Sequence, residues 1–186
     1  MVTRRSFLSA GGLALAGLAA PNLARAILRP PAVLEIRMRS DPQGAHVWFE
    51  PLGAFIEPGT RVRWILAESV HSTAAYHPVN DRHSLRIPES AEPWDSGILV
   101  QAGAAFEVRL TEPGVYDYFC LPHEQAGMVG RLVVGAATGP GALPFDYFLD
   151  RRGTSDWRPV PPAARRAFPE VERILREKIV RHAHES

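Results

Sequence analysis

The sequence holds a single cysteine, and the residues around it constrain the chain more than any other stretch. Residues 116–130 read YDYFCLPHEQAGMVG, so that Cys120 is followed three positions on by His123 and eight positions on by Met128. A thiolate, an imidazole and a thioether are soft donors that suit copper, whereas calcium and magnesium prefer oxygen ligands. One type of copper site uses one cysteine, two histidines in a trigonal arrangement and a weak axial methionine. This loop provides three of these four ligands, and the second histidine has to come from elsewhere in the chain.

The second histidine is chosen from three candidates. His71 directly follows an expected strand at residues 61–66. His77 and His83 lie in a polar, proline-containing insertion at residues 75–93. Histidines in a polar loop are ordinarily solvated, and a preorganised metal site favours a ligand that a rigid strand holds in place. We therefore predict His71 as the ligand, with His77 as the alternative, and His77 and His83 together stay open as a second, weaker metal site.

Short strands separated by turns fill the middle of the chain. Val62, Trp64 and Leu66 alternate with two arginines, as in a strand with one buried face. Turns with adjacent proline and glycine precede two of the strands, at residues 57–60 and 112–114. Expected strands lie at residues 33–38 (as an edge strand), 45–50, 61–66, 106–110, 116–120 and 131–134. This pattern, which contains no helical period, predicts an all-β antiparallel sandwich.

The first 26 residues have the features of an export signal. Arg4 and Arg5 precede an apolar run that ends at Ala20, and a small-residue motif closes at Ala26. This order is typical of a secretory signal peptide, and the paired arginines indicate the twin-arginine type. We predict a signal peptide over residues 1–26, cleavage after it and a periplasmic location. An uncleaved anchor is the alternative, although the apolar run is shorter than the roughly 20 residues of a membrane span.

Charge and cysteine content exclude several classes of function. Removing residues 1–26 takes away three of the 21 basic residues, which leaves 18 against 20 acidic residues and a net charge of −2. With this balance and no basic stripe, nucleic acid is not an expected partner. One cysteine cannot form an internal disulfide, a Cys-x-x-Cys-His haem attachment or a four-cysteine zinc site. A lone thiol in an oxidising compartment is open to oxidation unless it is buried or bound to metal, which favours a ligand role for Cys120.

The end of the chain differs in composition from the predicted sandwich. Residues 137–186 form an extension that is first rich in proline and glycine and then becomes amphipathic. Residues 169–182 predict a helix with acidic residues in its first turn and basic residues in its last. Its apolar face would hold Val171, Ile174, Leu175 and Ile179. The sequence leaves open whether this extension packs on the sandwich or docks on a partner.

Several motifs occur together between residues 33 and 134. They are Glu57-Pro58-Gly59-Thr60-x-Val62-x-Trp64, His71-Ser72, Trp94-Asp95-Ser96-Gly97, Pro113-Gly114-x-Tyr116-x-Tyr118-x-Cys120-x-Pro122-His123 and Gly127-Met128-x-Gly130. This set resembles the cupredoxins of the plastocyanin/azurin family, and the spacing from cysteine to histidine to methionine is most similar to that of pseudoazurins. The resemblance implies a Greek-key cupredoxin sandwich over residues 27–136, to which the extension is added.

The resemblance also implies a metal site. It would hold one type 1 (blue) copper ion, ligated by His71, Cys120, His123 and Met128. The backbone amide of Ser72 would help to hold the Cys120 sulfur. The insertion at residues 75–93 and the extension depart from a minimal cupredoxin, and they put in doubt the usual exposed apolar docking face of the family.

These expectations point to a one-electron carrier that works between redox partner proteins and is not an enzyme. The resemblance implies that the electron leaves through His123, beside Pro122. A copper delivery or storage module is the alternative from another class, and a subunit of a larger redox complex is a third. A Cys–His hydrolase would need an oxyanion hole and an orienting carboxamide, and the sequence carries neither signature. The oligomeric state is not indicated.

Overall fold

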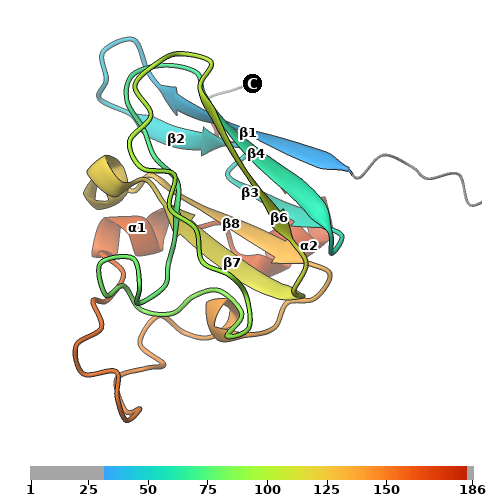
Figure 1. Ribbon diagram of the computed structural model, residues 1–186, viewed down its shortest axis with the longest axis vertical. Helices are drawn as coiled ribbons and strands as arrows, with labels where there is room; N and C mark the ends of the chain where they lie inside the picture. Colours follow the sequence, from blue (N-terminus) through green and yellow to red (C-terminus); the bar gives the residue numbers. More distant parts are fainter. Residues whose placement is uncertain (1–31, 184–186) are drawn as a thin grey trace, which may run out of the picture.

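The computed structural model describes residues 32–183, and the predicted signal peptide at residues 1–26 lies outside the described residues. The described part contains two β-sheets (Figure 1). The first has the strand order β2-β1-β4-β6, with β1 (Val33–Ser40), β2 (Val47–Glu50), β4 (Thr60–Leu66) and β6 (Ala105–Leu110). The second has the order β5-β7-β8-β3-β9, with β3 (Gly53–Ile56), β5 (Ala74–Ala75), β7 (Gly114–Phe119), β8 (Val129–Val134) and β9 (Ile179–Val180). This arrangement confirms the predicted all-β sandwich, but the strands are not all antiparallel as predicted, because β1 with β4 and β3 with β8 are parallel pairs.

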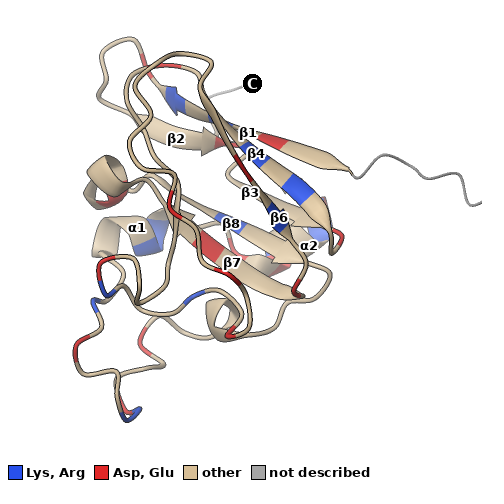
Figure 2. Ribbon diagram, viewed as in Figure 1, with Lys and Arg blue, Asp and Glu red and all other residues tan. Residues whose placement is uncertain are grey.

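The first sheet follows the alternation expected from its sequence. In β4 the side chains of Val62, Trp64 and Leu66 are buried, whereas Arg61 and Arg63 are exposed. A strand places successive side chains on opposite faces, so that one face enters the core and the other meets water. Figure 2 shows basic and acidic residues along the strands of this sheet. The apolar faces of the two sheets therefore meet in a shared core.

The predicted edge position of the first strand is wrong. β1 lies inside the first sheet, where it pairs with β2 on one side and with β4 on the other. Its pairing with β4 is parallel, from Val33 opposite Arg61 to Met38 opposite Leu66. Strand order depends on contacts between segments far apart in the chain. The loose local alternation of this segment therefore did not indicate its neighbours.

Strands β7 and β8 are buried on both faces. On the inner face, Tyr116 and Tyr118 belong to the core between the sheets. On the outer face, Val115 packs with residues of the extension, and Phe119 packs with both the extension and the insertion. The strand that leads to Cys120 is therefore enclosed between two layers, which is a rigid support for a ligand.

The extension folds back onto the outer face of the second sheet. After the 3₁₀ turn η2 (Pro140–Ala142) it forms α1 (Pro162–Ala167) and α2 (Val171–Glu177). The last described element, β9, pairs antiparallel with β3 and adds a strand to the sheet. The structure thus answers the question that the sequence left open, because the extension packs on the sandwich.

The predicted helix at residues 169–182 is shorter than expected. The helix α2 ends at Glu177, because Lys178 adopts a left-handed conformation with a φ of 65°. Within α2, Ile174 is fully buried, whereas Leu175 is partly exposed, as is Ile179 beyond the helix. Ile179 already belongs to β9, so it does not continue the helical face. Within residues 32–183, no helix is both long enough and apolar enough to cross a membrane.

A buried group of charges ties the extension to the second sheet. Asp117 of β7 accepts hydrogen bonds from Arg86 Nε at 2.7 Å and from Arg131 Nε and Nη2 at 2.6 and 3.0 Å. Arg86 also donates to the carbonyl of Gly141, and Arg131 to that of Pro169. All three charged side chains are almost inaccessible to water. Since an isolated buried charge is costly, these mutual contacts are what allow the charges to be buried.

Candidate metal centre

His71 is held at the end of the first sheet by its backbone and by its ring. Its amide donates to the carbonyl of Leu99, and the Leu99 amide donates to the carbonyl of His71, at 3.2 and 2.8 Å. On the far side of the ring, His71 Nε2 lies 3.0 Å from the hydroxyl of Ser40, the last residue of β1. With Nε2 engaged in this way, Nδ1 is left to face the ligand loop. The sequence showed no sign of Ser40, because its place beside His71 arises only from strand pairing.

The ligand loop is a tight, internally bonded turn. Cys120 directly follows the last residue of β7 and precedes the 3₁₀ helix η1 (Leu121–Ala126), which the sequence did not predict. The loop closes when the amide of Cys120 donates to the carbonyl of Met128 at 3.0 Å and the amide of Met128 donates to that of His123 at 3.1 Å. Gly127 makes this closure possible with a φ of 86°, which favours glycine. The side chains of Cys120 and Met128 are both fully buried in the same core cluster.

Three predicted ligands meet in one place. His71 Nδ1 lies 3.1 Å from His123 Nδ1 and 3.7 Å from Cys120 Sγ, and Cys120 Sγ lies 3.4 Å from His123 Nδ1. Among residues 32–183, these three are the only group of three or more histidine, cysteine and acidic side chains placed to share a metal ion. The prediction that residues 71, 120 and 123 converge is thus supported by the geometry.

The size of this triangle suits a small metal ion. Metal–nitrogen bonds of about 2.0 Å and metal–sulfur bonds of about 2.3 Å in a trigonal plane place donor atoms about 3.5 to 3.7 Å apart. The measured separations of 3.1, 3.4 and 3.7 Å are close to these values. A set of two imidazoles and one thiolate is the donor set of a blue-copper centre. The residues present therefore fit a copper ion.

Ser72 braces the sulfur and the loop at the same time. Its backbone amide donates to Cys120 Sγ at 3.3 Å, the contact that the family resemblance implies. Its hydroxyl accepts a hydrogen bond from the amide of Leu121 at 2.8 Å. Ser72, which lies between β4 and β5, thus fixes both the Cys120 sulfur and the start of η1. Such contacts orient ligands and adjust the properties of a metal centre.

Burial sets the protonation of the metal-free ligands. Burial, together with the nearby His123, lowers the pKa of His71 to about 4, although Glu68 acts in the opposite direction. Burial also lowers the pKa of His123. The same burial raises the pKa of the Cys120 thiol to about 11, while hydrogen bonds from Ser72 and His123 act against this shift. At neutral pH the two imidazoles are therefore neutral and ready to bind metal, whereas the thiol keeps its proton.

Copper binding should therefore release one proton per ion at pH 7 to 8, and that proton should come from Cys120. A metal displaces protons only from ligands that still hold them, and the pKa values of both histidines lie below this range, whereas that of the thiol lies above it. The apparent affinity should then rise about tenfold per pH unit in this window. The measurement is a copper titration of metal-free protein in weak buffer, followed with a pH indicator. Release of two or more protons, or of none, would contradict these protonation states.

The other histidine candidates lie apart from this triangle. His77 Nδ1 accepts a hydrogen bond from the amide of Val79 at 3.2 Å on the protein surface. His83 is 2% exposed, so the expectation that it is solvated is wrong. Its ring nitrogens face the carbonyl of Asn80 at 2.6 Å and the carboxylate of Glu124 at 3.2 Å. Because both ring nitrogens of His83 are engaged with oxygen, the structure gives no support to a second metal site at residues 77 and 83.

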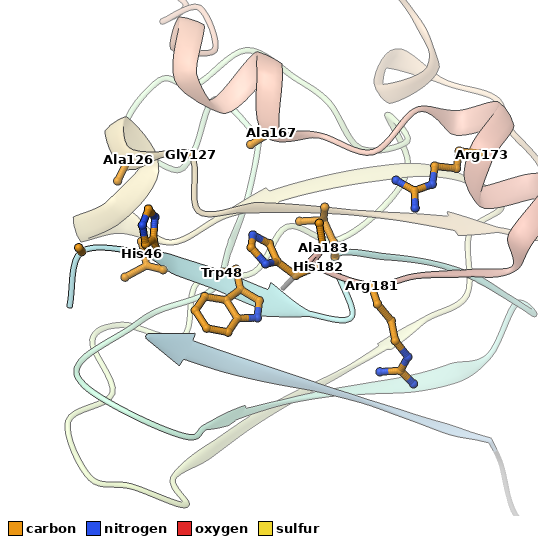
Figure 3. Close-up of a pocket in the computed structure, with 12 residues that line it drawn as sticks. His46, Trp48, Ala126, Gly127, Ala167, Arg173, Arg181, His182 and Ala183 are labelled. Atoms are coloured by element: carbon orange, nitrogen blue, oxygen red, sulfur yellow. The ribbon is translucent and has the colours of Figure 1, made fainter. Parts of the chain in front are cut away.

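A cavity of about 360 Å³ lies beside the ligand loop but is separate from the three converging ligands. Figure 3 shows it between the stacked rings of Trp48 and His182, whose centroids are 5.0 Å apart, and the loop residues Ala126 and Gly127. Arg173 and Arg181 at its rim form ion pairs with Glu177 and Glu50. None of the four predicted copper ligands lines this cavity.

Comparisons with known proteins agree with the donor set. The profile described as copper binding proteins of the plastocyanin/azurin family matches residues 36–135. The chain belongs to this family. The match covers more than half of the chain, including both predicted histidine ligands and the whole ligand loop. It confirms the expected cupredoxin fold and copper as the cofactor.

Individual cupredoxins resemble the chain to different extents. A pseudoazurin from Paracoccus pantotrophus is 31% identical over 130 residues, which are 70% of this chain and 77% of that protein. The minor plastocyanin isoform of Arabidopsis thaliana is 52% identical over 40 residues, which are 22% of this chain and 23% of that protein. Among solved structures, a pseudoazurin from Sinorhizobium is 29% identical with a TM-score of 0.46, over 57% of this chain and 76% of that one.

A second solved structure is also similar to this cupredoxin. Native pseudoazurin from Hyphomicrobium denitrificans is 21% identical with a TM-score of 0.49, over 73% of this chain and 92% of that one. Membership in a family of copper-binding electron-transfer proteins also agrees with the prediction that the chain is not an enzyme.

Proposed function

We propose that this cupredoxin is an exported blue-copper protein that carries single electrons between redox partners. The observation that carries the proposal is the triangle of His71 Nδ1, Cys120 Sγ and His123 Nδ1. Two neutral imidazoles and a sulfur at these separations form the trigonal donor set of blue copper. Membership in the plastocyanin/azurin family adds independent support.

In this proposal four side chains hold the copper ion. His71 and His123 would bind through Nδ1, Cys120 as a thiolate and Met128 through its thioether. When bound, copper supplies the one-electron chemistry by alternating between the cupric and cuprous states. The chain contributes a cage that is braced from outside by Ser72, so that the ligands keep their places in both states. One electron is taken from a reduced donor and given to an oxidised acceptor, and no covalent bond within the chain is made or broken.

His123 is the proposed point of exit for the electron. His71, Cys120 and Met128 are fully buried, whereas His123 is only partly covered. Leu121 beside it is 49% exposed, and Pro122 is exposed as well. The helix α1 of the extension packs against the loop near Gly127. These residues therefore leave a small apolar surface next to His123 on which a redox partner protein would dock.

Export is proposed from the first 26 residues and from the state of the thiol. The paired arginines and the short apolar run are typical of a twin-arginine signal peptide. Cys120 is fully buried, as a free thiol in an oxidising compartment should be. The proposed mature protein starts after Ala26 in an extracytoplasmic compartment. It joins a cupredoxin domain at residues 27–136 to the extension at residues 137–186.

Reversible electron exchange tests the carrier function against copper delivery. A carrier should give a reversible voltammetric response, because its buried ligands do not rearrange between oxidation states. It should also keep its cuprous ion for hours in the presence of a competing chelator. A delivery module should lose the ion to the chelator within minutes and respond irreversibly at the electrode. This second result would overturn the carrier function while leaving the copper ligands in place.

A further inference from the structure

Glu124 occupies an unusual place for a charged side chain. It directly follows the proposed ligand His123 in η1, yet it is only 6% exposed and is turned into the protein. A carboxylate is costly to bury unless hydrogen bonds and opposite charge replace its water. The contacts that stabilise Glu124 in this position therefore also fix the segment of backbone that carries His123.

Those contacts all come from the insertion. The hydroxyl of Tyr76 donates to Glu124 Oε1 at 2.6 Å, and Nε2 of His83 lies 3.2 Å from Oε2. The other nitrogen of His83 is 2.6 Å from the carbonyl of Asn80, which holds the ring in its orientation. Tyr76 and His83 are themselves almost fully buried. Both carboxylate oxygens are thus engaged by side chains more than forty positions away in sequence.

The insertion also contacts Phe119, the residue directly before Cys120. The rings of Tyr76 and His83 pack against Phe119, with centroids 4.7 and 4.4 Å apart, and Phe119 directly precedes Cys120. Tyr76 is anchored in turn, because its amide donates to the carbonyl of Asp117 in β7 at 3.0 Å. The same two side chains therefore touch the chain immediately before Cys120 and immediately after His123.

We propose that Tyr76, His83 and Glu124 form a buried clamp by which the insertion positions His123 at the copper site. The three are positioning residues, because they act through the backbone of the loop and not by contact with the metal. The proposal rests on the proposed function in one respect, which is that His123 is a copper ligand. The insertion would then be part of the copper site's support.

Two conservative variants test the clamp against a matched control. Tyr76→Phe removes only the hydroxyl that holds Glu124, and Glu124→Gln keeps the shape of the side chain but removes its charge. Tyr116→Phe is the control, because it also removes one tyrosine hydroxyl and one hydrogen bond, of 2.7 Å to the carbonyl of Glu112. Tyr116 is part of the core but its hydroxyl has no contact with the loop. The combination of Y76F with E124Q completes a double-mutant cycle.

The first readout needs no metal. In the copper-free protein, hydrogen exchange at the amides of His123 and Met128, which are bonded within the loop, reports how often the loop opens. Loss of a buried hydrogen bond to a charged group should speed this exchange about tenfold in Y76F and in E124Q. The double variant should exchange less than the product of the two single effects, because both act on one contact. The Tyr116→Phe control should leave these amides at the wild-type rate.

The second readout uses the copper-loaded protein. In Y76F and E124Q, the reduction potential and the ratio of the visible absorption bands should shift from the wild-type values. A role confined to stability would lower the melting temperature in all three variants and leave both copper properties unchanged. Wild-type exchange rates at His123 and Met128 in Y76F and E124Q would overturn the clamp. If the loop opens faster but the copper properties do not move, its positioning role is overturned while the proposed function stands. If wild-type protein fails to form a coloured copper site, the proposed function fails, and the metal-free exchange still decides whether the clamp exists.

Discussion

Replacing Cys120 with serine should abolish the intense visible colour of the copper-loaded protein. The colour of a blue-copper centre arises from charge transfer between the thiolate and the cupric ion, and a hydroxyl oxygen is a hard, poorly matched substitute. Serine fits the space of Cys120, and the amide of Ser72 that now faces the sulfur at 3.3 Å would face the hydroxyl instead. The fold should therefore survive. The measurement is the absorption spectrum of the variant with cupric ion, recorded beside that of the wild-type protein.

His77→Gln is the matched control for this experiment. His77 was the alternative ligand on sequence grounds, but it lies on the surface and accepts its hydrogen bond from Val79. Its replacement should leave the colour at full intensity. A colourless H77Q protein, or a C120S protein that keeps its colour, would show that the ligands are assigned to the wrong residues.

Replacing Asp117 with asparagine should lower the free energy of unfolding by about 3 to 5 kcal/mol, because two arginines would be left buried without a counter-charge. Asp117 is fully buried between Arg86 and Arg131, at 2.7 and 2.6 Å. Both arginines also hold carbonyls of the extension, so the variant should loosen the extension as well. Urea denaturation followed by tryptophan fluorescence gives the change in stability.

The control for Asp117 is an ion pair on the surface. Glu107 and Arg61 meet at 3.3 Å on the exposed face of the first sheet. Glu107→Gln should cost at most about 1 kcal/mol, since solvent screens such pairs. An equal loss of stability in the two variants would mean that the buried group of charges stabilises the fold no more than the surface ion pair does. Folded D117N protein should keep its copper colour, because the Asp117 side chain contacts none of the proposed copper ligands.

Three of the four predicted ligands, His71, Cys120 and His123, converge because their placement depends on local sequence. Cys120, His123 and Met128 share one short loop that directly follows β7. His71 could be chosen from three histidines because only it follows a core strand directly. Spacing within a loop and position relative to a strand are both features that a single sequence displays.

Features that depend on distant contacts were missed. β1 was expected at an edge because its own alternation is loose, but its place is decided by pairing with β2 and β4. The predicted helix at residues 169–182 has a continuous apolar face, yet Lys178 turns left-handed and the next residues join β3. A new strand pairing thus outweighed local periodicity.

The insertion was the least predictable part of the site. Residues 75–93 carry no period of two or of 3.6, so their polar side chains were expected to be solvated. His83 and Glu124 are instead buried against each other, and Tyr76 completes the contact. Glu124 meets both of these partners across more than forty positions of sequence, so no local pattern could have revealed the contact. The one local sign of this contact was the carboxylate of Glu124 directly after the ligand histidine. The sequence alone did not show which residues would surround that carboxylate.

The most direct test of a copper centre built from His71, Cys120, His123 and Met128 is one absorption spectrum. Protein that starts at residue 27 is titrated with cupric ion, then reduced and reoxidised. The proposed site predicts an intense visible band that saturates at one copper per chain, bleaches on reduction and returns on reoxidation. Saturable copper binding without a visible band would contradict the trigonal thiolate site, and an absence of binding would contradict the copper centre altogether.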